Sequence, residues 1–327
     1  MAKPSTHAAV DWDAVYTAHG QEFLSNTPKD NYFTGNPTLD YLKADQGSYS
    51  GGDYLIEPLI HTGQSGTTSI ARGQQFSLAV TDPVTAAEYR IAHYVSPVTI
   101  YKEDEVKAGG MGGRLNLVET YIDNVRSSAE RTLSQHLWAT SQASTTDINP
   151  LPVLISTDGL GTVGNINRTT YTFWRNKRYS TITASTGLLD KMRSLLNDVS
   201  RGNKGGTRPG LIVTTQSVYE AYMDLAEQAH VINTNASSGQ SRIADLGFPV
   251  ANYQGIPITW DENCPSGRMY FLNKEGVKMR TMGKGWTLTP FQSTYGQGIA
   301  ARTAVLEGWF QTSVSESRIL GQLDTIT

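Results

Sequence analysis

The pattern of apolar and polar positions changes sharply along this chain of 327 residues. The first 50 residues are polar and interrupted by glycine and proline, with apolar clusters only around 10–16 and 39–42. Such a segment cannot close a core of its own. We therefore expect residues 1–50 to form an arm that lies on other surfaces, with a short helix at 38–44 capped by Thr38.

Two segments with strand periodicity bracket a polar insert. Apolar side chains alternate through 52–61 and 87–102, whereas 62–86 is rich in Gly, Thr, Ser and Gln, with one thin alternating stretch that begins at Phe76. The pattern predicts a long hairpin that leaves the body of the protein, about 30 Å long at about 3.3 Å per residue. Because an isolated two-stranded arm is marginal in water, the hairpin implies a partner.

The strongest periodic signal predicts one long helix over 112–141, about 45 Å long at about 1.5 Å per residue. Its apolar stripe follows three-and-four spacing and consists of Leu115, Val118, Ile122, Val125, Ala129, Leu133, His136 and Thr140. We expect His136 to be packed in the core. The glycines at the start of the helix lack the Gly-Lys-Ser/Thr ending of a phosphate loop. We interpret them as a flexible hinge made of Gly109, Gly110, Gly112 and Gly113.

Helical and strand patterns alternate in the second half of the chain, which predicts an α+β or α/β domain over 147–290. Helices are expected at 187–199 and 217–230, and a buried strand at 211–213. The inward residues of the first helix are expected to be Leu188, Met192, Leu195, Leu196 and Val199. Further strand pieces are expected at 256–260, 268–273, 277–281, 286–291, 300–307 and 309–314.

Residues 159–164 read Gly-Leu-Gly-Thr-Val-Gly, which matches the dinucleotide-binding fingerprint, and the apolar run 151–155 precedes them like a strand. A nucleotide-binding loop must open a helix, but 165–178 does not begin like a helix, 170–174 has strand periodicity, and no acidic residue stands about 20 positions after the last glycine. A nicotinamide-dependent oxidoreductase that uses Gly159–Gly164 is therefore the weaker alternative, from a different class.

Composition argues against catalysis and against electrostatic binding. The net charge is −3, so no overall field attracts nucleic acid or an anionic membrane. The single Cys264, expected as a small apolar filler, excludes disulfides within the chain, and the six histidines show no metal-ligand spacing. We expect no enzyme activity, no cofactor and no metal. No membrane span or signal peptide is visible, which predicts production in the cytoplasm.

The order of arm, strand, polar hairpin, strand and long helix resembles the major capsid proteins of tailed bacteriophages with the HK97-type fold. The resemblance covers residues from about 35 to 315. Its further parts are Gly159-Leu160, 163–168, Trp174-Arg175-Asn176, 253–258, Asp261, 265–267 and 270–273.

That resemblance implies an α+β HK97-like capsid fold with an N-terminal arm at 1–50. It further implies a peripheral domain at 51–146, an axial domain at 147–290 and a C-terminal return to the peripheral domain at 291–327. The peripheral domain would contain the extended loop 62–86 and the spine helix. The implied function is to form, as pentamers and hexamers, the icosahedral shell around the double-stranded DNA of a tailed phage. An encapsulin-type bacterial compartment is the alternative within the same fold.

The resemblance also implies partners and contacts. The virion would be assembled in the host cytoplasm with a portal and a separate scaffolding protein, and a decoration protein is an open alternative. DNA would be enclosed without sequence-specific binding, and no membrane would be involved. The loop contains no lysine, so no isopeptide cross-link can start there. The residues expected at contacts between subunits are Arg72, Phe76, Glu103, Asp104, Glu105, Arg175, Lys177 and Arg178.

Overall fold

The computed structural model describes residues 35–49, 51–63, 69–75, 82–107, 111–200, 208–228 and 251–327. Helices and strands are mixed throughout, which confirms the predicted α+β class. Contacts divide the chain into two compact units. In its described part, the first unit contains Tyr94–Leu133 and Gly285–Gly308. The second contains Gly35–His93, Ser134–Lys284 and Trp309–Thr327. The domain boundaries expected at 146 and 290 stay a prediction.

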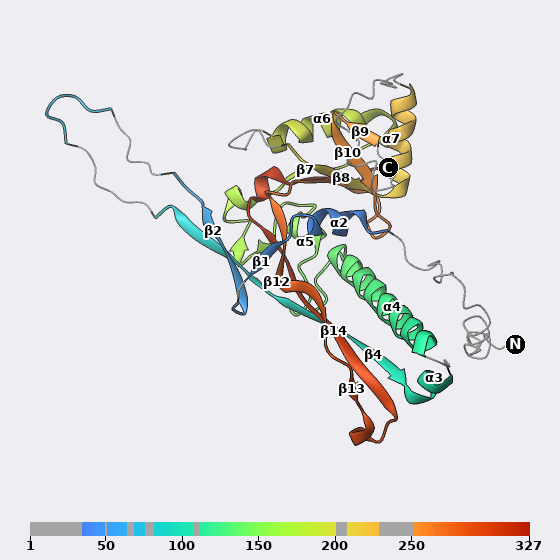
Figure 1. Cartoon of the computed structure of the whole chain (residues 1–327). Helices are drawn as coiled ribbons and strands as arrows, with labels where there is room; N and C mark the ends of the chain where they lie inside the picture. Colours follow the sequence, from blue (N-terminus) through green and yellow to red (C-terminus); the bar gives the residue numbers. More distant parts are fainter. Residues whose placement is uncertain are drawn as a thin grey trace, which may run out of the picture. The chain divides into compact units, whose positions relative to one another are not determined.

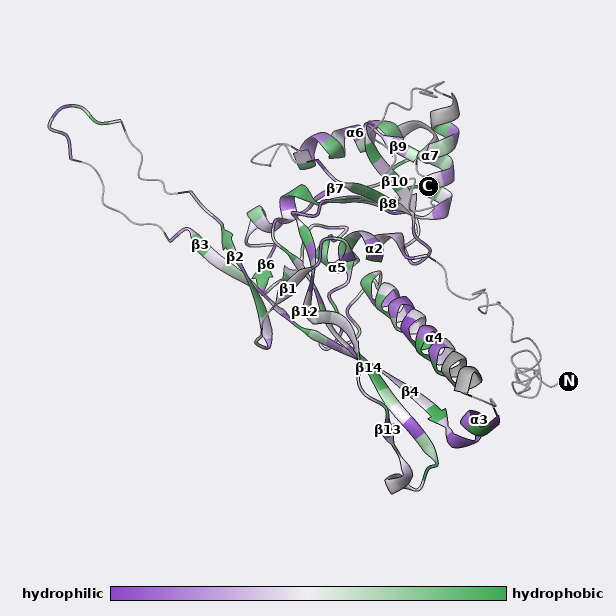
Figure 2. Ribbon diagram, in the orientation of Figure 1, coloured by the Kyte–Doolittle hydropathy of each residue, from purple (hydrophilic) through white to green (hydrophobic). Residues whose placement is uncertain are grey.

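The long predicted helix is present as α4 (Met111–Leu137) and ends four residues earlier than expected. Ala129 and Leu133 are buried as predicted, and Leu137 is also buried. The face of the helix visible in Figure 2 is mostly hydrophilic. The expectation for His136 was wrong. Its side chain is 38% exposed, because Nδ1 lies 3.8 Å from the carboxylate of Asp147 instead of in the core.

Two long strands organise the five-stranded sheet, whose order is β1-β12-β14-β13 with β4 also paired to β14 (Figure 1). Each long strand joins two segments that the sequence pattern had separated. These strands are β12 (Val277–Leu288) and β14 (Ala301–Val314). The others are β1 (Gly47–Tyr49), β13 (Gln292–Ser293) and β4 (Ala92–Tyr101), which leads into α3 (Lys102–Lys107). A glycine inside a strand does not end it, and Gly283 and Gly285 continue β12 with φ of 76° and 86°.

The predicted hairpin is formed by β2 (Tyr54–Ile60) and β3 (Val84–Arg90), which pair antiparallel from Tyr54 opposite Arg90 to Ile60 opposite Val84 (Figure 1). The single strand expected over 87–102 is divided at Ile91 into β3 and β4. One face of the hairpin is buried and consists of Leu55, Leu59, Ala87 and Tyr89. Of the loop between the strands, residues 61–63, 69–75 and 82–83 are described, and Phe76 lies outside the described residues.

A six-stranded mixed sheet forms the centre of the second unit, in the order β7-β15-β11-β8-β10-β9. The strands are β7 (Lys177–Tyr179), β15 (Gly321–Leu323), β11 (Met269–Leu272), β8 (Leu211–Thr214), β10 (Ile256–Trp260) and β9 (Ala251–Tyr253). Helices α6 (Ala184–Ser200) and α7 (Gln216–Gln228) pack on it. All five inward residues predicted for α6 are buried in this core, so that prediction is confirmed. The C-terminal segment does not return wholly to the first sheet, because β15 pairs with β7 and β11.

Three local predictions were wrong. Residues 151–155 form the short helix α5 (Leu151–Leu154), because Pro150 and Pro152 favour a helix start over a strand. The strand expected over 170–174 is replaced by the 3₁₀ turn η1 (Thr172–Trp174), and β7 follows it. The predicted helix α2 (Pro37–Lys43) is present, but Thr38 does not cap it. Its hydroxyl donates to Asp261 at 2.7 Å instead.

Candidate assembly surfaces

The glycine fingerprint forms a tight β-hairpin and no nucleotide loop. Strands β5 (Thr162–Val163) and β6 (Ile166–Asn167) are joined by Gly164 and Asn165, with φ of 59° and 62°. Two left-handed residues in a two-residue connection make the type I′ turn that suits strand twist. No helix follows that could hold a pyrophosphate. The oxidoreductase alternative therefore loses the motif on which it depended.

Gly164 instead brings this turn against the long hairpin. Its carbonyl accepts the Glu88 N–H at 3.2 Å, and the Asn165 amide donates to the Glu88 carboxylate at 3.1 Å. A Cβ at Gly164 would lie 2.7 Å from Cβ of Ala87 and 3.0 Å from the Tyr89 ring. Only glycine permits this approach, so the motif has a packing role on β3.

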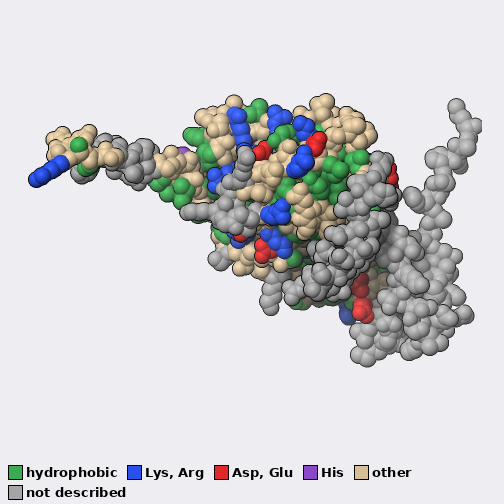
Figure 3. Space-filling model, turned by 90° about the horizontal axis from the view of Figure 1, so that it is seen from above, with side chains coloured by type: hydrophobic (Ala, Val, Ile, Leu, Met, Phe, Trp, Pro, Cys, Tyr) green, Lys and Arg blue, Asp and Glu red, His purple; other side chains and the backbone are tan. Residues whose placement is uncertain are grey.

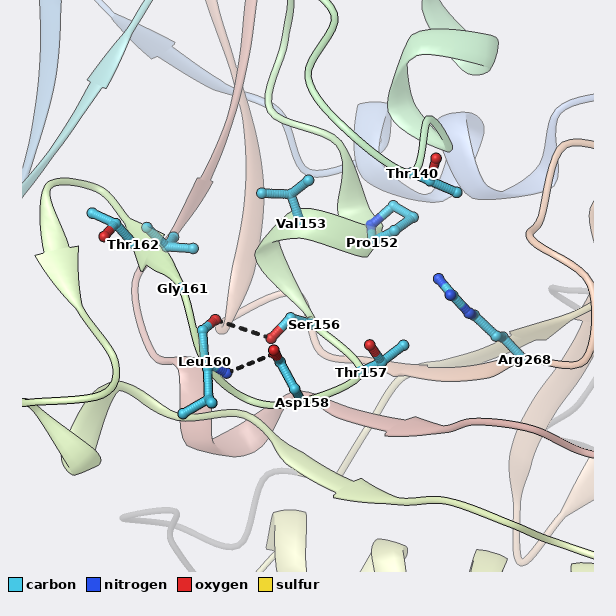
Figure 4. Close-up of a pocket in the computed structure, with 11 residues that line it drawn as sticks. Thr140, Pro152, Val153, Ser156, Thr157, Asp158, Leu160, Gly161, Thr162 and Arg268 are labelled. Carbon is cyan, nitrogen blue, oxygen red and sulfur yellow. Dashed lines mark hydrogen bonds between the residues drawn. The ribbon is translucent and has the colours of Figure 1, made fainter.

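The preceding loop lines a pocket of about 310 Å³. The Leu160 N–H donates to Asp158 at 2.9 Å and lowers the pKa of that carboxyl group, and Ser156 donates to the Leu160 carbonyl at 3.2 Å. Arg268 points into the pocket (Figure 4), but its Nε already donates to Asp324 at 3.1 Å. The charged groups here therefore serve bonds within the chain.

The arginines of the basic run at 175–178 form hydrogen bonds within their own unit. Arg175 donates to the backbone carbonyls of Arg168 and Thr169 at 2.7 and 3.0 Å, and Arg178 donates to that of Thr157 at 2.7 Å. Lys177 is exposed on β7. Contacts of these side chains with neighbouring subunits stay a prediction. Arg175 and Arg178 have hydrogen-bond partners within the chain, whereas the hydrogen bonds described include none from the Lys177 side chain.

Sequence reasoning missed Arg168, which is fully buried. Its guanidinium donates to the Leu154 carbonyl and to the hydroxyls of Ser317 and Ser156, the latter two at 3.2 and 3.4 Å. Burial lowers its pKa to about 10. A single arginine in a polar stretch gives no sequence signal for this role, because most arginines are exposed.

The acidic residues of α3 have partners in their own unit. Glu105 is 8% exposed and lies 2.8 Å from Lys102 and 3.6 Å from Arg302. Glu103 pairs with Lys107 at 3.0 Å. Glu105 is therefore held within the chain, which weakens its expected contact with a neighbour. Asp104 is half-buried on the same helix.

The remaining expected residues lie apart from these. Arg72 is exposed in the described part of the insert. Gly112 and Gly113 belong to the first turn of α4, so the helix continues through half of the predicted hinge. Gly109 and Gly110 lie outside the described residues.

The outer face of the β2–β3 hairpin carries several exposed apolar side chains that the sequence reasoning did not assign to a contact. Its exposed fractions are 51% for Tyr54, 58% for Ile56, 80% for Ile60 and 54% for Val84. Cross-strand pairing places Pro58 and Ala86 on the same face, and both are exposed. We call the six residues Tyr54, Ile56, Pro58, Ile60, Val84 and Ala86 the hairpin face. Glu88 and Arg90 lie opposite Ile56 and Tyr54 on this face and are exposed, so the face is apolar toward Ile60 and Val84 and charged at its other end. An exposed surface with this many apolar side chains marks an interaction site.

Other kinds of site find little support. Lys and Arg side chains are scattered over the face seen in Figure 3 and do not gather in one basic patch. In the described ranges, no cluster of three His, Cys, Asp or Glu residues is arranged to hold a metal ion. None of the helices described combines the length and apolarity that crossing a bilayer requires. Cys264 is buried, and desolvation raises the pKa of its thiol.

No family model and no curated protein matches the sequence. Solved structures do match over almost the whole chain. A capsid protein of Cyanophage A-1(L) has a TM-score of 0.70 at 16% identity, over 93% of this chain and 96% of that one. The capsid of a native GTA particle has a TM-score of 0.62 at 10% identity, over 99% of this chain and 100% of that one. The SrpI encapsulin of Synechococcus elongatus PCC 7942 has a TM-score of 0.61 at 10% identity, over 95% of this chain and 94% of that one. The chain therefore has the fold of these shell proteins, as the resemblance to the HK97-type fold predicted.

Proposed function

We propose that this chain is a major capsid protein whose copies form pentamers and hexamers and build the icosahedral shell of a tailed bacteriophage. The observation that carries the proposal is the hairpin face. A chain with the fold of shell proteins presents a two-stranded ribbon with apolar side chains on both faces, and its own body covers only one of them. A second copy of the chain covers the other face in the shell.

The role is structural. Several polar groups at the candidate sites are bonded within the chain, which supports this role. They belong to the glycine turn, the Arg175 and Arg178 side chains and the Asp158 loop. Head-to-tail contacts between unlike surfaces generate rings, so the hairpin face must meet a different surface on the next copy. Interfaces of permanent assemblies exceed about 2,000 Å², which suits a projecting hairpin.

The encapsulin alternative remains a second candidate because the match to the SrpI encapsulin is nearly as strong as those to the phage particles. A phage capsid additionally requires a portal, a scaffolding protein and DNA, and in some cases a decoration protein. We assign DNA enclosure and assembly in the host cytoplasm to this chain as part of the proposal. Arg72, Lys177 and Asp104 are the charged residues that we assign to contacts between subunits, with the glycines at 109–113 and the hairpin as the joints.

Expression of the chain with and without its candidate scaffolding protein tests the proposal. Sedimentation and electron microscopy should reveal closed megadalton particles, and a protein that remains a compact monomer under both conditions would refute it. Ile56→Glu places a charge in the hairpin face at a site that is 58% exposed, so the protomer should still fold. Particle yield should fall at least tenfold, because a loss of about 1.4 kcal/mol per contact weakens association tenfold. Ile56→Val, which keeps the face apolar, is the matched control and should assemble normally.

A further inference from the structure

The exposed edges of the β-sheets carry a second pattern, and it concerns how the chain avoids the wrong contacts. An uncovered edge strand offers a row of N–H and C=O groups to which another chain can add as a strand. In the part of the chain that the structure describes, β2 pairs only with β3, and β4 pairs only with β14. The other edge of β2 is seven residues long. On β4, His93 and Tyr94 have further contacts, and no other described strand pairs with the edge that continues from Val95 to Tyr101.

Backbone hydrogen bonds show which residues of β2 face its unpaired edge. The His61 N–H donates to Pro83 at 3.0 Å, and the Ile91 N–H donates to Asp53 at 3.3 Å. Backbone groups alternate in direction along an antiparallel strand, so the odd-numbered residues of β2 point to β3 and the even-numbered ones point outward. Pro58, at the middle of β2, is one of the outward residues, and it has no N–H to offer.

The free edge of β4 has the same feature. The Lys102 N–H donates to Ala300 at 2.9 Å, and the hydroxyls of Thr99 and Thr303 lie 3.3 Å apart in the same register. Even-numbered residues of β4 therefore bond to β14, and odd-numbered ones point outward. Pro97 is again an outward residue near the middle of the strand, and its side chain is exposed.

The other edges are protected in different ways. The outer edge of β3 is occupied where its Glu88 N–H meets the Gly164 carbonyl. β12 extends beyond the short β1, and in that part Gly283 and Gly285 have left-handed φ values, which interrupt the regular strand edge. A Cβ added at either glycine would meet no atom within 4 Å, so close packing does not require glycine there. The remaining edge strands β1, β7, β9 and β13 have three residues or fewer.

We propose that Pro58 and Pro97 close the two long free edges to strand addition, so that copies of this chain associate through side-chain faces and do not extend one another's sheets. The strand edge at Pro58 needs this protection most. The side chains of β2 in the hairpin face are apolar, and they would favour β-aggregation of a free protomer. The inference goes beyond the shell function, since it applies to the protomer before any particle forms.

The test restores the missing donors. Pro58→Val and Pro97→Val, singly and together, add an outward N–H without changing a bond to β3 or β14. Unassembled protomer is incubated at low concentration, and sedimentable material and intermolecular β-sheet are measured by centrifugation and infrared spectroscopy. We expect a several-fold gain in both for each variant and a larger gain for the double variant.

Matched controls separate the donor from the side chain. Ile56→Val and Thr99→Val place the same β-branched side chain at outward positions that already have an N–H, and they should behave like the parent chain. Pro58→Thr and Pro97→Thr restore the donor with a polar side chain and should aggregate too. Proline variants that match the parent, or controls that aggregate equally, would overturn the inference. Particle formation by the parent chain is scored separately and tests only the shell function.

Discussion

At the scale of single residues, Arg168 shows how a polar loop can be fixed from inside. Its guanidinium joins the segment of Leu154 and Ser156 to the distant Ser317, and these hydrogen bonds go to carbonyl and hydroxyl oxygens. A buried charge without an ionic partner costs desolvation energy, which the lowered pKa reflects. The hydrogen bonds to these two segments must therefore offset that cost.

Arg168→Met tests this balance, because methionine keeps much of the volume and removes the donors. We expect the free energy of unfolding to fall by about 2 kcal/mol, since the Leu154 carbonyl and Ser317 hydroxyl lose their partner while buried. Urea unfolding of dissociated protomer measures it. Arg193→Ala breaks an exposed pair with Asp190 and should cost less than about 0.5 kcal/mol. Unchanged stability of the methionine variant would mean that charge burial cancels the hydrogen bonds.

Buried tyrosines predict the response to alkaline pH. Burial raises the pKa of the phenols of Tyr41, Tyr89 and Tyr270 well above 10, the value of an unfolded tyrosine. Above pH 10 the unfolded chain loses these protons and the folded chain keeps them, so stability is complete below pH 10 and falls as pH rises further.

Ultraviolet titration of tyrosinate, followed in parallel with circular dichroism, checks this expectation. These three phenols should ionise only when the secondary structure is lost, and Tyr89→Phe should reduce the slope of stability against pH above 10. Tyr171→Phe, at a residue 49% exposed, is the control and should leave the slope unchanged. Reversible ionisation of all tyrosines in the folded protein would contradict the prediction.

At the scale of elements, the turn at Gly164 ties the short β5–β6 hairpin to the long one. Gly164→Ala adds a Cβ that would lie 2.7 Å from Ala87 at a left-handed φ, so we expect a loss of about 2 kcal/mol or more from strain and overpacking together. Gly161→Ala also has a left-handed φ of 87° but open space around it, so strain alone should cost about 1 kcal/mol. Thermal unfolding of both variants measures the difference, and equal losses would show that the close packing on β3 is unimportant.

The elements also show what the sequence could and could not predict. Strong periodicity located α4, α6, α7, β8 and the long hairpin, because one face of each is consistently apolar. Residues 170–174 alternated like a strand, yet they fold as a 3₁₀ turn in which the Trp174 indole donates to the Val163 carbonyl at 3.1 Å. That bond is tertiary and leaves no local signal. The hairpin face was missed for a related reason. Alternation of apolar and polar residues identifies a strand with one buried face. Additional apolar residues on the other face of β2 and β3 weaken that alternation, and only the fold shows that the chain leaves this face uncovered.

At the scale of the whole molecule, charge argues that the shell can form without its cargo. The chain has 27 basic and 30 acidic residues, and several of the arginines named above are committed to bonds within the chain. A near-neutral protein gains little from counterion release on DNA, whereas apolar burial at the hairpin face does not depend on phosphate.

We therefore expect particles to assemble from nuclease-treated protein and to have the ultraviolet spectrum of protein alone. Assembly yield should change little between low and high salt, because salt screens exposed charges and leaves apolar contacts intact or strengthens them. Electron microscopy of particles formed at both salt concentrations, with and without added double-stranded DNA, provides the measurement. A requirement for DNA, or a steep loss of particles as salt rises, would show that charge contacts such as those assigned to Arg72 and Lys177 dominate the association and that the hairpin face has a minor part in it.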